Sequence, residues 1–177
     1  MSSKQIVIPG VKKNVRRKVI IDATQNNLLS KKDLNVDMAT QKNILCALQE
    51  KLTNSSSIEQ NVLTFVTKEL NNKLNSYKHQ DKKNNIYDSE SFITEEELLE
   101  KLIISKSKCN YCEKNVKIIY EQKRDDYQWT LDRIFNSVGH SCKNTVISCL
   151  KCNLDRKIIH QKKFIFTKKM VIHKLDN

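Results

Sequence analysis

Apolar residues in the first half of the chain recur at helical spacing. Over residues 38–53, the positions that share one helix face are Met38, Leu45, Leu48 and Leu52. The polar run Asn54–Ser57 interrupts the pattern, and a second helix is expected to follow it, with Ile58, Val62, Phe65, Val66, Leu70 and Leu74 on one face. Two amphipathic helices with a short polar connection predict a helical hairpin over residues 36–79.

A third helix is expected after a polar segment. Residues 80–88 are rich in Gln, Asp, Lys and Asn, so we expect a linker there. The helix should begin at Thr94, because Thr94 and Glu97 have the spacing of a capping box. Its apolar face consists of Leu98, Leu99, Leu102 and Ile103, and it leads directly to Cys109.

The second half of the chain mixes short apolar stretches with one further helix. Strands are expected at residues 116–120 and 129–134, and residues 144–147 lead into a second cysteine pair. A helix should run from about Cys149 to His160. Weak alternation over residues 163–172 suggests a closing strand. The chain is therefore expected to be α+β, with an N-terminal helical region followed by a second domain over residues 89–177.

The charge is strongly basic and unevenly distributed. The net charge is +12, and residues 106–177 hold 16 basic and 7 acidic residues. Residues 1–35 form a basic arm, for which phosphate contact, nuclear targeting and a merely solvated tail all remain open. A surplus of this size favours a polyanionic partner such as nucleic acid, with DNA preferred. The alternative is a Lys-rich surface that serves only solubility.

The chain has no apolar run long enough for a membrane helix, and its N-terminus lacks the apolar core of a secretory signal. We therefore expect an intracellular protein without a membrane partner. In a reducing compartment, paired Cys-x-x-Cys motifs indicate metal ligands rather than disulfides.

Two such pairs occur, and 36 residues separate them. Four thiolates suit a tetrahedral structural zinc, and the expected ligands are Cys109, Cys112, Cys149 and Cys152. Cys46 is expected to be a small buried apolar residue. Cys142 fits neither pair, so it could be a surface thiol or a substitute ligand.

Further polar residues accompany the cysteine pairs in a fixed order. They are Leu131-Asp132-Arg133-Ile134, Gly139-His140, Asn144, and Cys149-x-x-Cys152-Asn153-x-x-Arg156. This ordered set resembles the HNH endonuclease family, and in particular the zinc-containing recombination endonucleases of the ββα-metal superfamily. The resemblance covers about residues 94–165. The sequence is also similar in character to proteins of large DNA viruses, which would place it in the nucleus or cytoplasm of a host cell.

The resemblance implies a β-hairpin followed by a helix, which together hold one catalytic divalent cation. Asp132 and Asn153 would be its ligands, and their hard oxygens suit Mg²⁺ or Mn²⁺. Asn144 would orient the base. The side chains implied to contact nucleic acid are Arg133, Lys151, Arg156 and Lys157.

The chain departs from the family at position 133. The family has a histidine there that activates water, whereas Arg133 stays protonated and cannot accept a proton. Arg133 could hold the scissile phosphate. His140 is then the nearest candidate base, and water activated by the cation is another route.

Each of these polar residues also has an ordinary structural interpretation. Asp132 could pair with a neighbouring Lys, Asn153 could cap a helix, and His140 could be a turn residue. Trp129 is more often hairpin core than a platform for a nucleobase.

Three function classes remain open. The leading hypothesis is an HNH-type endonuclease that acts on DNA. The alternative is a catalytically impaired HNH-derived zinc-finger protein that binds DNA or RNA. A third hypothesis is an assembly factor that oligomerises through the helices at 38–78.

Overall fold

The computed structural model describes residues 37–50 and 60–170. Within them it has an α+β fold, as expected from the sequence. The helices and strands occur in the order α1 (Met38–Glu50), α2 (Gln60–Lys83), α3 (Glu95–Ile104), β1 (Trp129–Arg133), β2 (Thr145–Cys149), α4 (Leu150–Arg156) and α5 (Gln161–Lys169). The expected basic arm, together with Leu52 and Ile58, lies outside the described residues.

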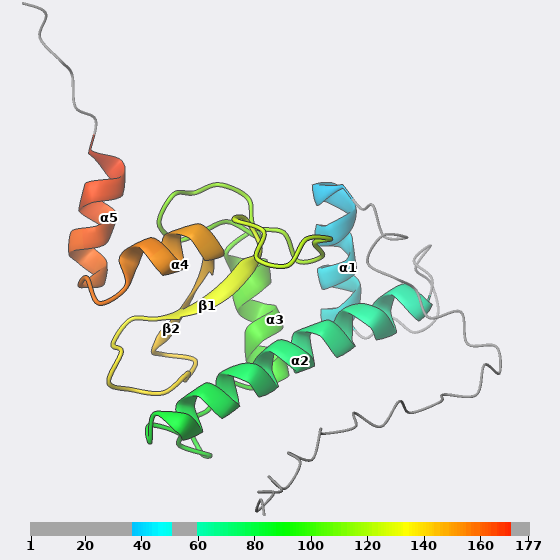
Figure 1. Cartoon of the computed structure of the whole chain (residues 1–177). Coiled ribbons are helices and arrows are strands. Elements are labelled where there is room, and N and C mark those ends of the chain that lie inside the picture. The colour runs from blue at the N-terminus through cyan, green and yellow to red at the C-terminus, as the bar shows by residue number, and fades with distance from the viewer. Residues whose placement is uncertain (1–36, 51–59, 171–177) are drawn as a thin grey trace, which may run out of the picture.

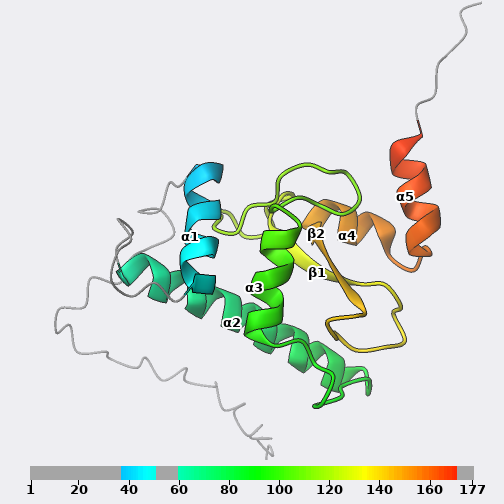
Figure 2. The same ribbon diagram turned by 180° about the vertical axis from the view of Figure 1, so that it is seen from behind.

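The first three helices pack as a group. α1 contacts α2 and also α3, and α2 contacts α3 as well. Figures 1 and 2 show α2 as a long helix that passes beneath α1, α3 and the strands. Its buried apolar residues are Leu63, Val66, Leu70 and Leu74. Among the described residues, none of the exposed large apolar side chains comes from α1 or α2, so these helices bury their apolar faces within the chain.

α2 extends further than the sequence suggested. Residues 80–83, expected in a linker, form its last turn, and Asp81 in that turn is fully buried. A polar composition predicts solvent exposure only when the polar groups lack partners inside the protein. Asp81 has such partners on the loop before β2.

The start of α3 agrees with the prediction. The Thr94 hydroxyl accepts a hydrogen bond from the Glu97 N–H at 3.2 Å, and the Thr94 N–H donates to the Glu97 carboxylate at 3.0 Å. The capping box is therefore confirmed, and it fixes the direction in which α3 delivers the chain to Cys109.

β1 and β2 form a two-stranded antiparallel sheet in which Trp129 pairs with Cys149 and Arg133 with Thr145. The expected strand at 129–134 is confirmed. The one at 116–120 is wrong, because this segment makes only an isolated bridge, from Lys117 to Gln128.

α4 and α5 correct two further expectations. α4 begins after its N-cap Cys149 as predicted but ends at Arg156, where Lys157 turns the backbone with a φ of 49°. Residues 161–169 are helix α5, not a strand. This helix is anchored by one buried residue, Phe164, whose ring meets that of Tyr111 edge-on at 5.0 Å. A single anchor leaves little apolar periodicity for the sequence to reveal.

The core joins both halves of the chain. Trp129 is buried in it, as the hairpin-core interpretation expected, and Lys73 of α2 lies 4.2 Å from the Trp129 ring centre. Gln41 of α1 accepts hydrogen bonds from the backbone N–H groups of Ile118 and Ile119 at 2.7 and 3.1 Å. Cys46, expected to be buried, is exposed on α1.

No helix in the described part of the chain combines the length and the apolar character that crossing a bilayer requires.

Candidate metal centre and the adjoining cleft

The sulfurs of Cys109, Cys112, Cys149 and Cys152 all lie within 4.8 Å of one another. The distance from Cys112 Sγ to Cys149 Sγ is 3.9 Å. In a tetrahedral zinc site with Zn–S bonds of about 2.3 Å, sulfurs are about 3.8 Å apart. These four cysteines could therefore hold a metal ion, and Cys142 is outside the cluster.

Two of these sulfurs accept hydrogen bonds from nearby backbone N–H groups, which orient them. The Tyr111 N–H donates to Cys109 Sγ, and the Cys152 N–H donates to Cys149 Sγ, both at 3.4 Å. Such bonds favour the thiolate form, which is the form that binds metal. The second one also makes Cys149 the N-cap of α4.

The thiols perturb one another. A hydrogen bond from Cys149 lowers the pKa of Cys109 to about 5, and the same bond raises the pKa of Cys149. Four thiolates this close repel one another unless a cation lies between them. The donor set is closed and sulfur-only, so it fits a structural zinc and not a hard cation.

Asp132 of β1 and Arg156 of α4 form a buried ion pair beside the metal centre. Arg156 Nε donates to Asp132 Oδ2 at 2.5 Å, and Nη2 donates to Oδ1 at 2.8 Å. The Tyr111 hydroxyl, from the first cysteine pair, also donates to Oδ2. Asp132 therefore links the first cysteine pair to α4.

Arg156 is 2 % exposed and makes further bonds within the protein. Its guanidinium donates to the carbonyls of Arg133 at 2.6 Å and Ile159 at 2.8 Å, and to Asn136 Oδ1 at 3.1 Å. Arg156 was expected at phosphate. The structure places it instead as a buried junction between α4, β1 and the loop that follows β1.

His140 is 3 % exposed and is held by Asp81. Its Nδ1 lies 2.7 Å from Asp81 Oδ1, and its backbone N–H donates to Asp81 Oδ2 at 2.6 Å. The Tyr77 ring lies against the imidazole, with ring centres 4.6 Å apart. A carboxylate only accepts, so Nδ1 carries the proton and Nε2 keeps its lone pair.

Burial lowers the pKa of His140 below its ordinary value, although the charge of Asp81 acts in the opposite direction. Burial thus favours the neutral imidazole, which is the form that can accept a proton.

A cleft of about 590 Å³ lies where α2, β1 and α4 meet. The residues that the sequence singled out and that line it are Asp132, Arg133, His140, Asn153, Arg156 and Lys157. The cleft also receives Lys73 and Tyr77 from α2. Lys151 is exposed outside it.

Asn144 acts on the loop between the strands. Its Nδ2 donates to the carbonyls of Phe135, Val138 and Gly139 at 3.0, 3.1 and 3.0 Å. Its Oδ1 accepts from the Phe135 N–H at 2.9 Å. Asn144 thus fixes the loop that ends at His140 without lining the cleft itself.

The oxygen donors of Asp132 and Asn153 can be tested for a divalent cation. An ionised carboxylate has about four acceptor positions, and Tyr111 and Arg156 use three of those on Asp132. The Asn153 amide donates through Nδ2 to the Thr130 hydroxyl at 3.1 Å, which leaves its oxygen for a ligand. One carboxylate position and one amide oxygen are hard donors of the kind that Mg²⁺ or Mn²⁺ takes. The adjacent Arg156 charge makes this a weak site.

Sequence reasoning missed Asp81, Lys73 and Tyr77. For two of them a signal was present. The buried face of α2 recurs at steps of three and four residues, and continuing that series beyond Leu74 reaches Tyr77 and then Asp81. The polar composition of residues 80–85 concealed it.

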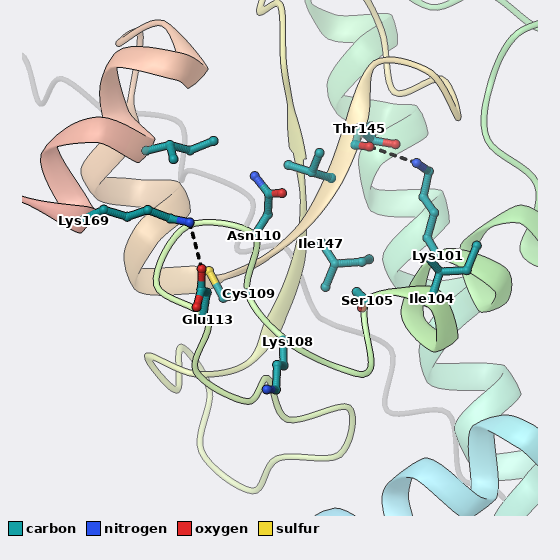
Figure 3. Close-up of a pocket in the computed structure, with 12 residues that line it drawn as sticks. Lys101, Ile104, Ser105, Lys108, Cys109, Asn110, Glu113, Thr145, Ile147 and Lys169 are labelled. Carbon is teal, nitrogen blue, oxygen red and sulfur yellow. Dashed lines mark hydrogen bonds and ion pairs between the residues drawn. The ribbon is translucent and has the colours of Figure 1, made fainter.

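A second hollow of about 600 Å³ lies on the other side of the metal centre, between α3, β2 and α5 (Figure 3). Two of its lysines bond to groups of the protein itself. Lys101 donates to the Thr145 carbonyl at 3.0 Å, and Lys169 pairs with Glu113 at 2.9 Å. Apart from the cysteine ligand Cys109, it contains none of the residues expected to act chemically.

Comparison with protein-family models, with curated proteins and with solved structures found no match to this chain.

Proposed function

We propose that this protein is an HNH-type endonuclease that hydrolyses phosphodiester bonds in DNA and carries a structural zinc in its four-cysteine site. The observation that carries the proposal is the cleft. Asp132 and Arg133 of β1, His140 of the loop before β2 and Asn153 of α4 line one cavity. The lowered pKa of His140 favours the neutral imidazole, and the contact of Nδ1 with Asp81 leaves Nε2 to accept a proton.

The zinc would have a structural role and not a catalytic one. It would join the turn after α3 to the end of β2 and the start of α4. Tyr111 lies inside the first cysteine pair and holds Asp132, so the metal centre would also fix one wall of the cleft.

Asp132 and Asn153 would hold Mg²⁺ or Mn²⁺ through their oxygens. When bound, such an ion supplies positive charge against the negative charge that develops on the phosphate and the leaving oxygen.

The other side chains of the cleft would bind DNA or transfer a proton. Arg133 and Lys157 offer cationic donors to the phosphate backbone. His140 Nε2 would take the proton from the attacking water, a task that the guanidinium of Arg133 cannot perform.

The test is cleavage of supercoiled plasmid, linear duplex, four-way junction, single-stranded DNA and RNA by the zinc-loaded chain. We expect nicking or cleavage of DNA when Mg²⁺ or Mn²⁺ is added, and its loss in Asn153→Ala and Asp132→Asn proteins that still hold zinc. Absence of cleavage of every substrate with both cations would contradict the proposal.

A second candidate is a nucleic-acid-binding protein without cleavage, and the buried Asp132–Arg156 pair favours it. In such a protein Arg133 would serve affinity alone. Binding should then weaken steeply with salt, and Arg133→Ala should reduce affinity.

Arg133→His distinguishes the two candidates. An increase in cleavage would mean that position 133 is an impaired base site in a nuclease. No effect on the rate, combined with loss of cleavage in His140→Ala, would assign the base to His140. If neither the parent chain nor Arg133→His cleaves, the binding function stands.

A further inference from the structure

We propose that Asp81, in the last turn of α2, is the positioning residue for His140, and that it fixes the imidazole in the tautomer whose Nε2 is free to accept a proton. This inference rests on the proposed function of the cleft. It makes α2 part of the site, although Asp81 lies far outside the chain segment between the cysteine pairs.

The contact between the two residues is double. Asp81 is fully buried, and its two oxygens take different groups of His140, with Oδ1 facing the ring and Oδ2 accepting from the backbone N–H. One bond orients the imidazole, and the other fixes the backbone from which it projects. Together they restrict both the position and the tautomer of the ring.

Gly139 allows this close approach. A Cβ at position 139 would lie 2.9 Å from Asp81 Oδ2 and 2.5 Å from the Ile86 carbonyl oxygen. Any side chain there would push the loop away from the end of α2. Gly139 is therefore important because it has no side chain.

The charged and titratable groups around the pair support the assignment. Arg133 Nη1 from β1 lies 3.7 Å from Asp81 Oδ1, so it helps to compensate the buried carboxylate. Tyr77 from α2 covers one face of the imidazole. Asp132 of β1 adds a more distant negative charge. Arg133 thus stabilises the partner of the base, in addition to facing the cleft.

Replacing Asp81 with Asn should change the tautomer of His140. The backbone N–H of His140 requires an acceptor, so the Asn oxygen should stay on it. The Asn amide NH₂ then faces Nδ1, which must become the acceptor. The ring proton consequently moves to Nε2, where it blocks proton uptake from the cleft.

The kinetic experiment uses the full zinc-loaded chain with Mn²⁺ and the DNA form that it cleaves best. We expect Asp81→Asn to lower kcat by about 10²–10⁴-fold. The change in KM should be much smaller, because the carboxylate meets the substrate only indirectly, through its 3.7 Å contact with Arg133. Adding Asp81→Asn to His140→Ala should cause no further loss in kcat, since the tautomer has no effect once the imidazole is removed. Asp88→Asn, an exposed change beyond the same helix, should be silent.

The tautomer itself is measured by ¹⁵N NMR of the histidine rings at neutral pH, which does not depend on cleavage. The inference holds if His140 is protonated at Nδ1 in the parent chain and at Nε2 in Asp81→Asn. It is overturned if the parent ring is already protonated at Nε2, a result that needs no variant, or if the folded Asp81→Asn protein keeps the parent tautomer. A chain that cleaves no DNA but shows this exchange would refute the proposed function and retain the role of Asp81.

Discussion

The Asp132–Arg156 pair shows what decides the role of a charged residue. Both side chains are almost completely buried, and each meets the other through two bonds. Removing one partner of such a pair leaves an uncompensated charge in a medium of low polarity. Arg156 is thus committed to holding α4 against β1.

Arg156→Ala should therefore lower the free energy of unfolding by about 3–5 kcal/mol. Lys151→Ala, an exposed change on the same helix, is the matched control and should alter stability little. Urea unfolding of both proteins with zinc bound is the measurement. If Arg156→Ala were as stable as Lys151→Ala, the buried pair would not be what holds α4 against β1.

His140 should make stability depend on pH. Its pKa in the folded protein is below the ordinary value, so the unfolded chain binds more protons as the pH falls. The contribution of His140 to the free energy of unfolding is complete above the pKa of the unfolded chain, about 6.5. It declines as the pH falls below that value toward the pKa of the folded protein.

Urea unfolding of the parent chain and of His140→Gln at about pH 5.5 and pH 7.5 measures this contribution. Loss of metal from the thiolates also lowers stability in acid, and it affects both proteins alike. The parent chain should thus lose more stability between the two values than His140→Gln. An equal loss would contradict the burial of a neutral imidazole.

Among the elements, the loop from 134 to 144 depends on α2 as much as on the strands that it joins. Asn144 holds it from within, and Asp81 holds His140 from outside. The contact at Gly139 leaves no room for a methyl group.

Gly139→Ala should destabilise the protein by about 1–3 kcal/mol, because either the loop or the end of α2 must move. It should also reduce any cleavage, since His140 moves with the loop. Thermal unfolding and the cleavage assay together test this. Unchanged values in both would show that the loop does not depend on the close approach to Asp81.

The metal centre also joins separate elements, and the number of metal ions that it holds can be measured directly. We expect one zinc per chain by elemental analysis, lost on Cys109→Ser or Cys152→Ser together with cooperative unfolding. Cys46→Ser should keep the zinc, since Cys46 is exposed and outside the cluster. Retention of a full equivalent after loss of Cys109 or Cys152 would contradict a four-cysteine site.

Local signals predicted the elements that they govern. The capping box placed the start of α3, and the cysteine spacing brought four sulfurs together, because both depend on residues close in sequence or on a fixed metal geometry. Residues 116–120 have strand composition but only an isolated bridge, since the apolar run itself does not supply a pairing partner. The Asp81–His140 contact joins residues far apart in the chain, which no local pattern encodes.

At the scale of the whole molecule, the N-terminal helices and the second half form one structure. Gln41, Lys73, Tyr77 and Asp81 each contact groups beyond residue 115. The cleft therefore needs α2 for its wall and for the partner of His140. The expected boundary between a helical hairpin over 36–79 and a second domain over 89–177 stays a prediction, and these contacts join the two segments.

In the proposed mechanism, a buried histidine in this cleft activates water for DNA cleavage. This step is tested most directly by single-turnover cleavage with the zinc-loaded parent chain, His140→Ala and His79→Ala, where His79 is an exposed histidine on α2. We predict that His140→Ala loses about 10²–10⁴-fold in rate while keeping its zinc and its fold, and that His79→Ala stays within about twofold of the parent. A folded His140→Ala protein that cleaves DNA as fast as the parent chain would show that His140 is not the base.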